Sequence, residues 1–355
     1  MISTDRFYPY VLVPKETPAI WGGDALATRY GKHADPRAAI GESWECWDAN
    51  AVENGLFIGA TLGDLRARLG PDLMGPIDAA RMFPVLTKFI DARQALSVQV
   101  HPDDAYAQRV EHQPNGKTEC WYILEAQPGA ELVLGWTHDT NRAEYERRVA
   151  DGSLGEILRR VPVKPGEAYY LPAGTLHAIG AGVVLFETQQ ASDLTYRIFD
   201  WNRVGADGKP RELHVAKAAD VLDFRATFPA AIRQLGFDDG SVRRTFLIGD
   251  KRFLVEHVRV PAAGGRFVTN GLPLTVTALA TPLHTEAAGA GADIPPYGTI
   301  ITPAAAGAVT LTPAGGAWGE ALVVRPQPDI GTARADAMRA GIAQVDVEAF
   351  FKQFA

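Results

Sequence analysis

Three short segments of the sequence carry side chains of the kinds that bind divalent metal ions. In SVQVHPDD, strand alternation places Gln99 and His101 on one face and turns Val98 and Val100 to the other. Two donors from one strand can therefore reach the same ion. A lone histidine before Pro102 is more often a loop residue with an ordinary hydrogen bond, so the metal hypothesis depends on the other two segments.

The second segment, GKTECWYIL, offers a carboxylate on a strand that we predict to be buried. Lys117 and Glu119 share one face, whereas Cys120 points the opposite way, into the packing layer with Tyr122. An exposed strand carboxylate is the simpler alternative, but an unpaired carboxylate in this apolar run would be costly to bury. We therefore expect a cation beside Glu119 and do not expect Cys120 to be a ligand.

The third segment, GEAYYLPAGTLHAIG, has the spacing Gly, five residues, Pro-x-Gly, two residues, His. These positions are Gly166, Pro172, Gly174 and His177. The pattern predicts a strand that ends in a tight turn and delivers the histidine inward at the mouth of a barrel. A Pro-x-Gly turn alone is common, but the whole spacing after two earlier ligand strands is specific.

Together the three segments supply two histidines, one glutamate and one glutamine, and no thiolate. Nitrogen and oxygen donors of this kind suit zinc, manganese, iron or cobalt in a site that leaves a position open for water or substrate. The following segment, LFETQQASDLTYRIFDWNR, concentrates Glu187, Asp193 and Arg197. A solvated charged edge is the ordinary interpretation of such a segment. The flanking aromatic and aliphatic residues instead favour a partly enclosed Arg197 with a partner.

A mainly β fold is needed to position these side chains. Short β-like runs bounded by Gly and Pro recur as MFPVLTKFIDA, LSVQVHP, CWYILEA, AELVLGW, EAYYLPAG and GVVLFETQQ. Helical patterning is confined to TLGDLRARLG and to residues 141–160 and 334–351. Strands do not alternate regularly with helices, and no glycine-rich phosphate loop is present. The pattern favours antiparallel sheets with peripheral helices over a parallel α/β fold.

The composition changes after about Phe237. Strands such as RTFLIG, FLVEHVRV and LTVTALA are followed by Ala-, Gly- and Pro-rich segments between Ala287 and Gly319. We predict a catalytic domain over residues 1–237 and a smaller C-terminal β-domain with a helical tail over residues 238–355. The segment GTIITPAAAGAVTL contains no histidine or carboxylate, so we expect the metal site in the first domain.

Composition narrows the class of protein. Hydrophobic residues make up 46% and charged residues 22% of the 355 residues, which is typical of a soluble globular protein. A formal net charge of −7 and the lack of a basic run argue against nucleic-acid binding, although a pocket for a small anion can still be locally basic. No run approaches the ~18 apolar residues of a membrane helix.

The cellular compartment is predicted from two features. The N-terminal sequence lacks the basic start and unbroken apolar core of a secretory signal. Cys46 and Cys120 form no CxxC pair, and we expect two buried thiols rather than a disulfide. A reducing cytoplasm fits both features best.

At the candidate site the sequence resembles the type I mannose-6-phosphate isomerases (phosphomannose isomerases), a family of the cupin superfamily. The resemblance rests on SVQVHPDDAYA, GKTECWYIL, LPAGTLHAIG and QQASDLTYRIFDWNR in matching order, with WGG at Trp21 and GESWE around Glu42 in support. It covers about the first two-thirds of the chain. It implies a cupin-type antiparallel β-barrel, or jelly roll, with a second smaller β-domain and a few peripheral helices.

The resemblance also implies a role for each site residue. Zn²⁺, or another divalent ion, would be bound by Gln99, His101, Glu119 and His177. The residues expected in catalysis are Arg197, Lys117 and Glu119. The residues expected to contact or support the substrate are Lys88, Glu187, Asp193, Trp21 and Glu42.

The sequence departs from the family and its superfamily at several points. Many cupins begin their site with His-x-His, whereas Gln-x-His, which the isomerase family shares, favours isomerisation over oxidation. Only residues 141–160 correspond to the larger inserted helical domain of some members, so the chain resembles the compact bacterial form. Ile179 stands where some members have a tyrosine, and no role of that tyrosine carries over.

The implied reaction interconverts mannose 6-phosphate and fructose 6-phosphate through an enediolate. A metal ion and a fixed guanidinium would stabilise the enediolate charge. A glutamate, a lysine or a metal-bound water remains open as the proton carrier, and Lys88 or Lys117 as the phosphate ligand. Two other hypotheses are a non-catalytic sugar-binding or regulatory cupin and an iron-dependent cupin dioxygenase. The expected partner is a small sugar phosphate, and the sequence does not predict an oligomeric state.

Overall fold

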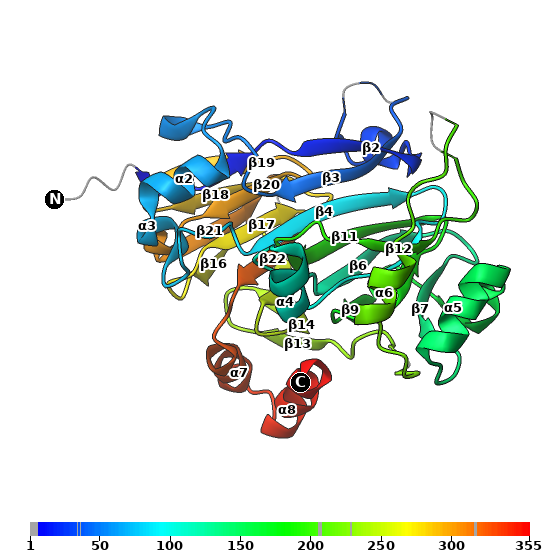
Figure 1. Ribbon diagram of the computed structural model, residues 1–355. Helices are drawn as coiled ribbons and strands as arrows, with labels where there is room; N and C mark the ends of the chain where they lie inside the picture. The colour runs from blue at the N-terminus through cyan, green and yellow to red at the C-terminus, as the bar shows by residue number, and fades with distance from the viewer. Residues whose placement is uncertain (1–5, 34, 36, 205–207, 228, 316–317) are drawn as a thin grey trace.

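The computed structural model describes residues 6–33, 35, 37–204, 208–227, 229–315 and 318–355 (Figure 1). The described residues form four sheets, and their strands pair in antiparallel fashion. This is the mainly β, antiparallel fold that the sequence predicts. No helix in these ranges combines the length and the apolar character needed to cross a membrane.

Two of the sheets carry the candidate site. The six-stranded sheet has the order β2 (Lys15–Gly23), β3 (Ile40–Cys46), β4 (Val85–Ala92), β11 (Val183–Gln190), β6 (Glu119–Ala126) and β9 (Ala168–Leu171). The five-stranded sheet has the order β12 (Tyr196–Phe199), β5 (Val98–Val100), β10 (His177–Ile179), β7 (Glu131–Trp136) and β8 (Leu158–Pro162). The six β-like runs from MFPVLTKFIDA to GVVLFETQQ each overlap one of these strands.

The other two sheets are formed mainly by the C-terminal third of the chain. The seven-stranded sheet has the order β1 (Tyr10–Leu12), β20 (Thr299–Thr302), β17 (Leu274–Ala278), β22 (Gly319–Pro326), β15 (Phe253–Val260), β14 (Arg243–Gly249) and β13 (Leu235–Asp238). The four-stranded sheet has the order β16 (Gly265–Val268), β21 (Ala308–Pro313), β18 (Leu283–Ala287) and β19 (Ala290–Ile294).

Apolar clusters show how the sheets are layered. Ile90 of β4 and Ile179 of β10 belong to one cluster, which joins the six- and five-stranded sheets. Phe186 of β11 and Leu322 of β22 belong to a second cluster, which joins the six- and seven-stranded sheets. Val258 of β15 packs with residues of the four-stranded sheet in a third. The five- and four-stranded sheets are therefore the outer layers and the other two are the inner layers.

The division at residues 237 and 238 stays a prediction, but the strand pairing bears on it. β1 pairs with β20, with Val11 opposite Ile300, so an N-terminal strand completes the C-terminal sheet. Lys32 and Glu45 form a buried ion pair, and the Lys32 ammonium also donates to the Tyr297 carbonyl. The N-terminal segment thus connects both halves of the molecule.

The predicted helices are confirmed in position but differ in length. α2 (Leu62–Leu69) lies within TLGDLRARLG, where Thr61 and Asp64 form a reciprocal capping box. The prediction of one helix over residues 141–160 is wrong at its C-terminal end. α5 (Arg142–Asp151) stops because Gly152 adopts φ 78°, and after a 3₁₀ turn over Leu154–Ile157 the chain enters β8.

The predicted tail helix is two helices. α7 (Ile330–Arg339) and α8 (Gln344–Phe351) are separated at Gly341, whose φ of 89° breaks the helix, and they pack together beneath the seven-stranded sheet (Figure 1). The remaining helices are α1 (Ala25–Thr28), α3 (Pro71–Met74), α4 (Asp104–Tyr106), continued by a π turn over Ala107–Glu111, and α6 (Val215–Val221). The shorter helices lack the apolar period that sequence analysis detects.

Candidate metal centre

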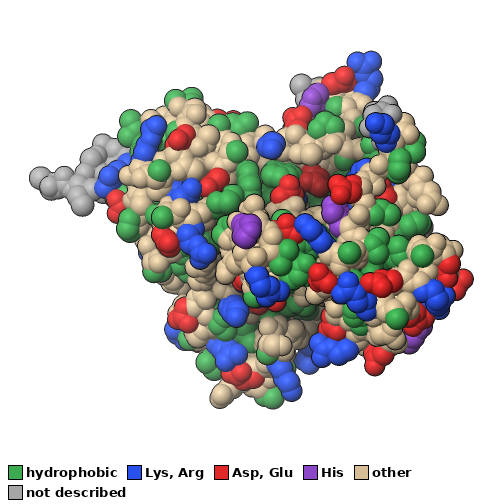
Figure 2. Space-filling model, in the orientation of Figure 1, with side chains coloured by type: hydrophobic (Ala, Val, Ile, Leu, Met, Phe, Trp, Pro, Cys, Tyr) green, Lys and Arg blue, Asp and Glu red, His purple; other side chains and the backbone are tan. Residues whose placement is uncertain are grey.

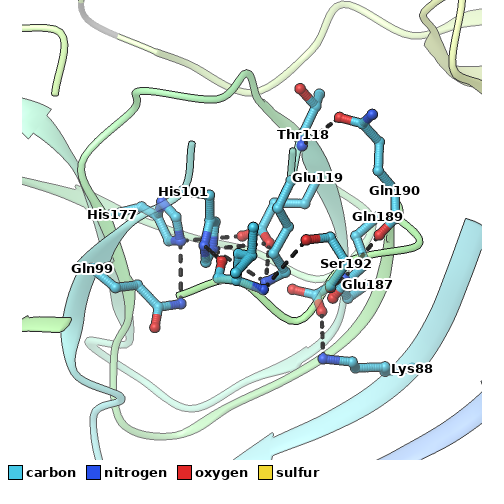
Figure 3. A network of polar contacts seen from close by, with 12 residues as sticks. Lys88, Gln99, His101, Thr118, Glu119, His177, Glu187, Gln189, Gln190 and Ser192 are labelled. Atoms are coloured by element: carbon cyan, nitrogen blue, oxygen red, sulfur yellow. Dashed lines mark hydrogen bonds and ion pairs between the residues drawn. The ribbon is translucent and has the colours of Figure 1, made fainter. Parts of the chain in front are cut away.

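Three strands bring His101, Glu119 and His177 together (Figure 3). His101 follows β5, and Glu119 and His177 are the first residues of β6 and β10. One ligand atom from each residue lies within 4.8 Å of those of the other two, and all three side chains are buried. Gln99 lies directly opposite His177 in the β5–β10 pair, and its side-chain nitrogen is 3.3 Å from His177 Nε2. The four residues predicted as ligands therefore form one cluster.

Backbone carbonyls orient both imidazoles. His101 Nδ1 is 2.8 Å from the Leu194 carbonyl oxygen, and His177 Nδ1 is 2.9 Å from the Thr175 carbonyl oxygen. Because a carbonyl only accepts, each Nδ1 carries the proton and each Nε2 keeps its lone pair. Both Nε2 atoms face Glu119. Hydrogen bonds of this kind fix the tautomer and the ring orientation of histidines that bind a metal ion.

The Pro-x-Gly turn places His177 as the sequence predicts. Gly174 adopts φ 88°, and a Cβ there would approach the Val221 carbonyl oxygen to 2.9 Å, so both conformation and space require glycine. The Gly174 N–H donates to the His101 carbonyl at 2.9 Å. The turn thus connects the two candidate histidine ligands directly.

The carboxylate of Glu119 is fully buried between the two imidazoles. Its Oε1 lies 3.2 Å from His177 Nε2, and its Oε2 lies 3.3 Å from His101 Nε2 and 2.7 Å from Lys117 Nζ. Within the described residues, neither oxygen has a hydrogen-bond partner of good geometry. A buried carboxylate facing two imidazole lone pairs is a donor set that fits a divalent cation.

The electrostatics of the site favour the forms that ligate metals. Burial, followed by the nearby Lys117 ammonium, lowers the pKa of His101 to about 3, so the imidazole is neutral. Burial opposes ionisation of Glu119, but Lys117, His101 and His177 together hold its pKa well below the usual range. Neutral imidazoles and an ionised carboxylate are the states that bind a metal ion.

A second polar cluster, formed by Glu42, Lys88 and Glu187, lies on β3, β4 and β11 beside the ligands. Lys88 Nζ is 3.4 Å from both Glu42 Oε2 and Glu187 Oε1, and it lies 4.8 Å from the centre of the Trp44 ring. The Trp121 indole N–H donates to Glu187 at 3.0 Å. Burial opposes the charge of Lys88, but the two carboxylates raise its pKa above the usual value.

Glu187 differs electrostatically from Glu119. Burial and the nearby Glu119 charge raise the pKa of Glu187, and its Oε1 has no hydrogen-bond partner in the described part of the chain. Asp193 follows in an exposed loop, and its charge contributes to the raised pKa of Lys88. The structure therefore places Glu42, Lys88, Glu187 and Asp193 near one another.

Arg197 borders the same site on the five-stranded sheet. It pairs with Gln99 across β12 and β5, so both side chains lie on the sheet face that carries His177. Its Nη1 donates to the Glu212 carbonyl at 3.1 Å, while Nε is buried without a hydrogen-bond partner among the described residues. Burial and the neighbouring Arg211 lower the pKa of Arg197. The predicted partial enclosure is thus observed.

The remaining predicted residues lie at the edge of this cluster or outside it. Trp21 packs in the apolar cluster between the two sheets, and its ring fills the space beside Gly41, which has no Cβ. Its role in substrate binding stays a prediction. Cys46 and Cys120 are free and buried, and Cys120 belongs to the apolar cluster on the far side of β6.

Sequence reasoning missed several residues that border the site. Trp121 lies two positions after Glu119, so strand alternation was a usable signal for it. Trp44 is related to Glu42 in the same way, and its indole N–H donates to Glu42 at 2.6 Å. Ser192, Gln189 and Gln190 form a polar network beside the ligands (Figure 3), where Gln189 donates to the Ser192 carbonyl and Gln190 accepts from Thr118 N–H. Gln189 and Gln190 end β11, and Gln189 lies opposite Glu119 in β6, so alternation from Glu187 was a usable signal for Gln189. Ser192 lies beyond the strand, where no local pattern predicts its position.

Comparisons with known proteins place the chain among sugar-phosphate isomerases. The model of the type I phosphomannose isomerase catalytic domain matches residues 12–146. Mannose-6-phosphate isomerase ManA of Bacillus subtilis (strain 168) is 44% identical over 219 residues, which are 61% of this chain and 68% of that protein.

Solved structures show the same fold over nearly the whole chain. The crystal structure of the Bacillus subtilis mannose 6-phosphate isomerase superposes with a TM-score of 0.81 at 30% identity, covering 89% of this chain and 99% of that one. A zinc-bound mannose 6-phosphate isomerase superposes with a TM-score of 0.70 at 15% identity, covering 91% and 100%. This chain therefore belongs to the type I phosphomannose isomerases.

Proposed function

We propose that the chain interconverts mannose 6-phosphate and fructose 6-phosphate, using a zinc ion held by Gln99, His101, Glu119 and His177. The observation that carries this proposal is the buried Glu119 carboxylate, which faces the lone pairs of two imidazoles oriented by backbone carbonyls. Family membership supports the reaction, and the nitrogen and oxygen donor set supports the metal.

A divalent ion bound there would supply Lewis-acid stabilisation of the oxygen charge that develops in an enediolate. The chain's own residues complete the electrostatics. Lys117 Nζ lies 2.7 Å from Glu119 Oε2 and 3.1 Å from His101 Nε2, so its ammonium charge is held at the ligand cluster. Fixed donors of this kind stabilise developing negative charge without reorganising during the reaction.

Proton transfer between the two carbons requires a group that both accepts and returns a proton. Lys117 and Glu187 are the side chains suited to this role beside the ligand cluster. The pKa of Glu187 is raised, which is the direction that suits a carboxylate general base, while Glu119 is held ionised beside Lys117 and the imidazoles. Because the pKa of Glu187 is raised and that of Glu119 is lowered, Glu187 is suited to proton transfer and Glu119 to metal binding.

The phosphate group needs a cation that is not already neutralised. Lys88 contacts Glu42 and Glu187, and Lys117 contacts Glu119, so both predicted phosphate ligands are engaged by carboxylates. Arg197 makes no ion pair among the described residues, and its buried Nε is an available donor. We therefore assign to Arg197 the contact with substrate charge, at the enediolate or at the phosphate.

A coupled assay tests the proposal. The full chain should convert mannose 6-phosphate to fructose 6-phosphate, lose this activity on chelation and regain it with zinc. A folded, zinc-loaded protein without turnover would refute the isomerase and leave the sugar-binding hypothesis. Oxygen uptake by an iron-loaded sample would instead support the dioxygenase.

The same proposal includes a cytoplasmic location. Two buried free thiols, Cys46 and Cys120, are compatible with a reducing compartment. On the face shown in Figure 2, acidic and basic side chains are interspersed, and no broad basic patch covers it. This surface is therefore not suited to bind a polyanion such as nucleic acid, and a small anionic metabolite is the expected partner. Fractionation of cells that express the tagged chain checks the location.

A further inference from the structure

The C-terminal part of the molecule contains a charged cavity that the proposed reaction does not use. It has a volume of about 440 Å³, which lies in the range of small-molecule pockets. Its walls come from β14, β16, β22 and α7, and none of the proposed metal or substrate residues lines it. The charged residues that line it are Asp239, Arg244, Arg266, Arg325, Asp336 and Arg339.

Two buried arginines on the cavity wall share one buried carboxylate. Arg244 Nε and Nη2 donate to Glu256 at 2.6 and 3.1 Å, and Arg325 Nε reaches the same carboxylate at 3.4 Å. Arg244 is 6% exposed, Arg325 is 4% exposed and Glu256 is inaccessible to solvent. A single carboxylate thus neutralises only one of two guanidinium groups that are shielded from water.

The carboxylates at the rim do not remove this imbalance. Asp336 contacts Arg244 Nη1 at 3.3 Å and pairs with Arg339, and Asp239 lies 3.7 Å from Arg244 Nη1. Neither is paired with Arg325 or Arg266 in the described ranges. The four arginines therefore face three carboxylates, and the excess positive charge lies on the side of Arg325 and Arg266.

Arg325 and Arg266 also have guanidinium N–H groups that make no hydrogen bond within the described residues. Arg325 Nη1 donates to the Val268 and Thr269 carbonyls at 2.8 and 3.2 Å, but no hydrogen bond from its Nη2 is found within the described residues. The Arg266 guanidinium has neither an ion pair nor a side-chain hydrogen bond in the same ranges, and it lies on an exposed position of β16. Burial lowers the pKa of Arg325, as expected for a charge without full compensation.

We propose that this cavity binds the phosphate dianion of a small phosphorylated metabolite, with Arg325 at its base and Arg266 at its rim. A dianion satisfies the excess charge and accepts the unused guanidinium donors, which match phosphate oxygens in geometry. The Arg244–Glu256 pair holds the arginines in place. The site is separate from the proposed metal centre, so its occupancy does not depend on the isomerase reaction.

Inorganic phosphate is the probe for a first test. Calorimetric titrations of the full, metal-loaded protein should show a phosphate site that is weakened at least about tenfold in Arg266→Ala and about a hundredfold in Arg325→Gln, since each removes charge-assisted hydrogen bonds. Arg243→Ala is the matched control, because Arg243 is the exposed neighbour of Arg244 on the opposite face of β14. It removes the same charge and should leave the isotherm unchanged.

Each outcome decides the proposal. Phosphate bound at the metal centre would persist in all four proteins, so only the component lost with Arg266 counts in favour. Identical isotherms for the wild type and Arg266→Ala, or an equal loss in Arg243→Ala, would overturn it. If Arg325→Gln fails to fold, Arg266→Ala still decides, because Arg266 is exposed. Isomerase kcat and KM in phosphate-free buffer should be unchanged in Arg266→Ala, which separates this result from a failure of the proposed function.

Discussion

Two buried charged clusters, one in each half of the molecule, are built on opposite principles. At the metal centre, Glu119 is surrounded by imidazole lone pairs and leaves both oxygens without good hydrogen bonds among the described residues. In the C-terminal cluster, Glu256 is saturated by Arg244 and Arg325. The first cluster therefore offers carboxylate and imidazole lone pairs to a metal ion beside the Lys117 ammonium, whereas the second is complete around its carboxylate and has positive charge in excess.

The comparison teaches how a buried carboxylate is assigned a role. Burial is equal in the two cases, since Glu119 and Glu256 are both fully inaccessible. The difference lies in the partners. Neutral imidazoles with fixed tautomers leave a carboxylate free for metal binding, while guanidinium groups consume its oxygens. Removing a residue from the metal centre should consequently affect metal binding and activity, whereas removing Glu256 from the C-terminal cluster should affect stability.

The largest expected effect is on the cation-binding cluster. His101→Ala or His177→Ala should abolish metal retention and lower isomerase activity by about a thousandfold or more, because the Lewis-acid contribution is worth several kcal/mol. Elemental analysis and the coupled assay measure the two losses. Cys120→Ser is the control, because Cys120 packs on the other side of β6 and should leave the metal content unchanged. Equal metal loss in the cysteine variant would show that the ligand set is wrong.

Removing the shared carboxylate of the C-terminal cluster should lower the stability of the fold. Glu256→Gln leaves two buried guanidinium groups without their carboxylate and should lower the free energy of unfolding by about 3–5 kcal/mol. Urea denaturation measures this change. Glu320→Gln is the control, because Glu320 is a half-exposed carboxylate on β22 whose surface pairing with Arg259 contributes at most about 1 kcal/mol. A similar loss in both variants would contradict the role of Glu256.

The stability effect should also depend on pH. Burial by itself would raise the pKa of Glu256. The charges and hydrogen bonds of Arg244 and Arg325 outweigh this effect and hold the pKa below the ordinary value of 4.5. A depressed pKa in the folded state means that the stabilisation is present above the pKa of the unfolded state and is lost as the pH falls through that of the folded state. The difference in unfolding free energy between wild type and Glu256→Gln should therefore be full at pH 7 and shrink below about pH 4. A difference that stays constant to pH 3 would contradict this.

A smaller effect is expected at the wall of the metal centre. Arg197→Lys keeps the charge but removes the planar fork of donors, and kcat should fall about a hundredfold if Arg197 stabilises the enediolate. The test is whether kcat and kcat/KM fall together. A nearly normal kcat with a greatly raised KM would assign Arg197 to the phosphate and shift the catalytic role to Lys117. Arg225→Lys, at an exposed pair with Asp223, should change neither constant.

The smallest effect is expected far from both clusters. Thr61→Ala removes one half of the capping box of α2 and should lower the free energy of unfolding by about 1 kcal/mol. Metal content and kcat should be unchanged, which shows that a stability loss by itself does not mimic the effects above. A measurable loss of metal in this variant would show that a loss of stability alone can lower the metal content, and would contradict the separation of the two effects.

Local sequence patterns were sufficient to predict which strand faces carry the candidate ligands. The period of two along a strand predicts that Gln99 and His101 share one face, and that Glu119 and Cys120 do not. The Pro-x-Gly turn predicts where His177 points, because only glycine fits the conformation and space at Gly174. These inferences depend on neighbours within a few residues, which the sequence contains directly.

Features that depend on distant segments were decided by the tertiary structure. The orientation of the imidazoles depends on the Leu194 and Thr175 carbonyls, and the cluster of Glu42, Lys88 and Glu187 depends on the register of three strands. The pairing of β1 with β20 and the sharing of Glu256 by two arginines likewise join positions far apart in the chain. Alternation determines which face a side chain occupies, but only strand register and sheet packing determine which charges it meets there.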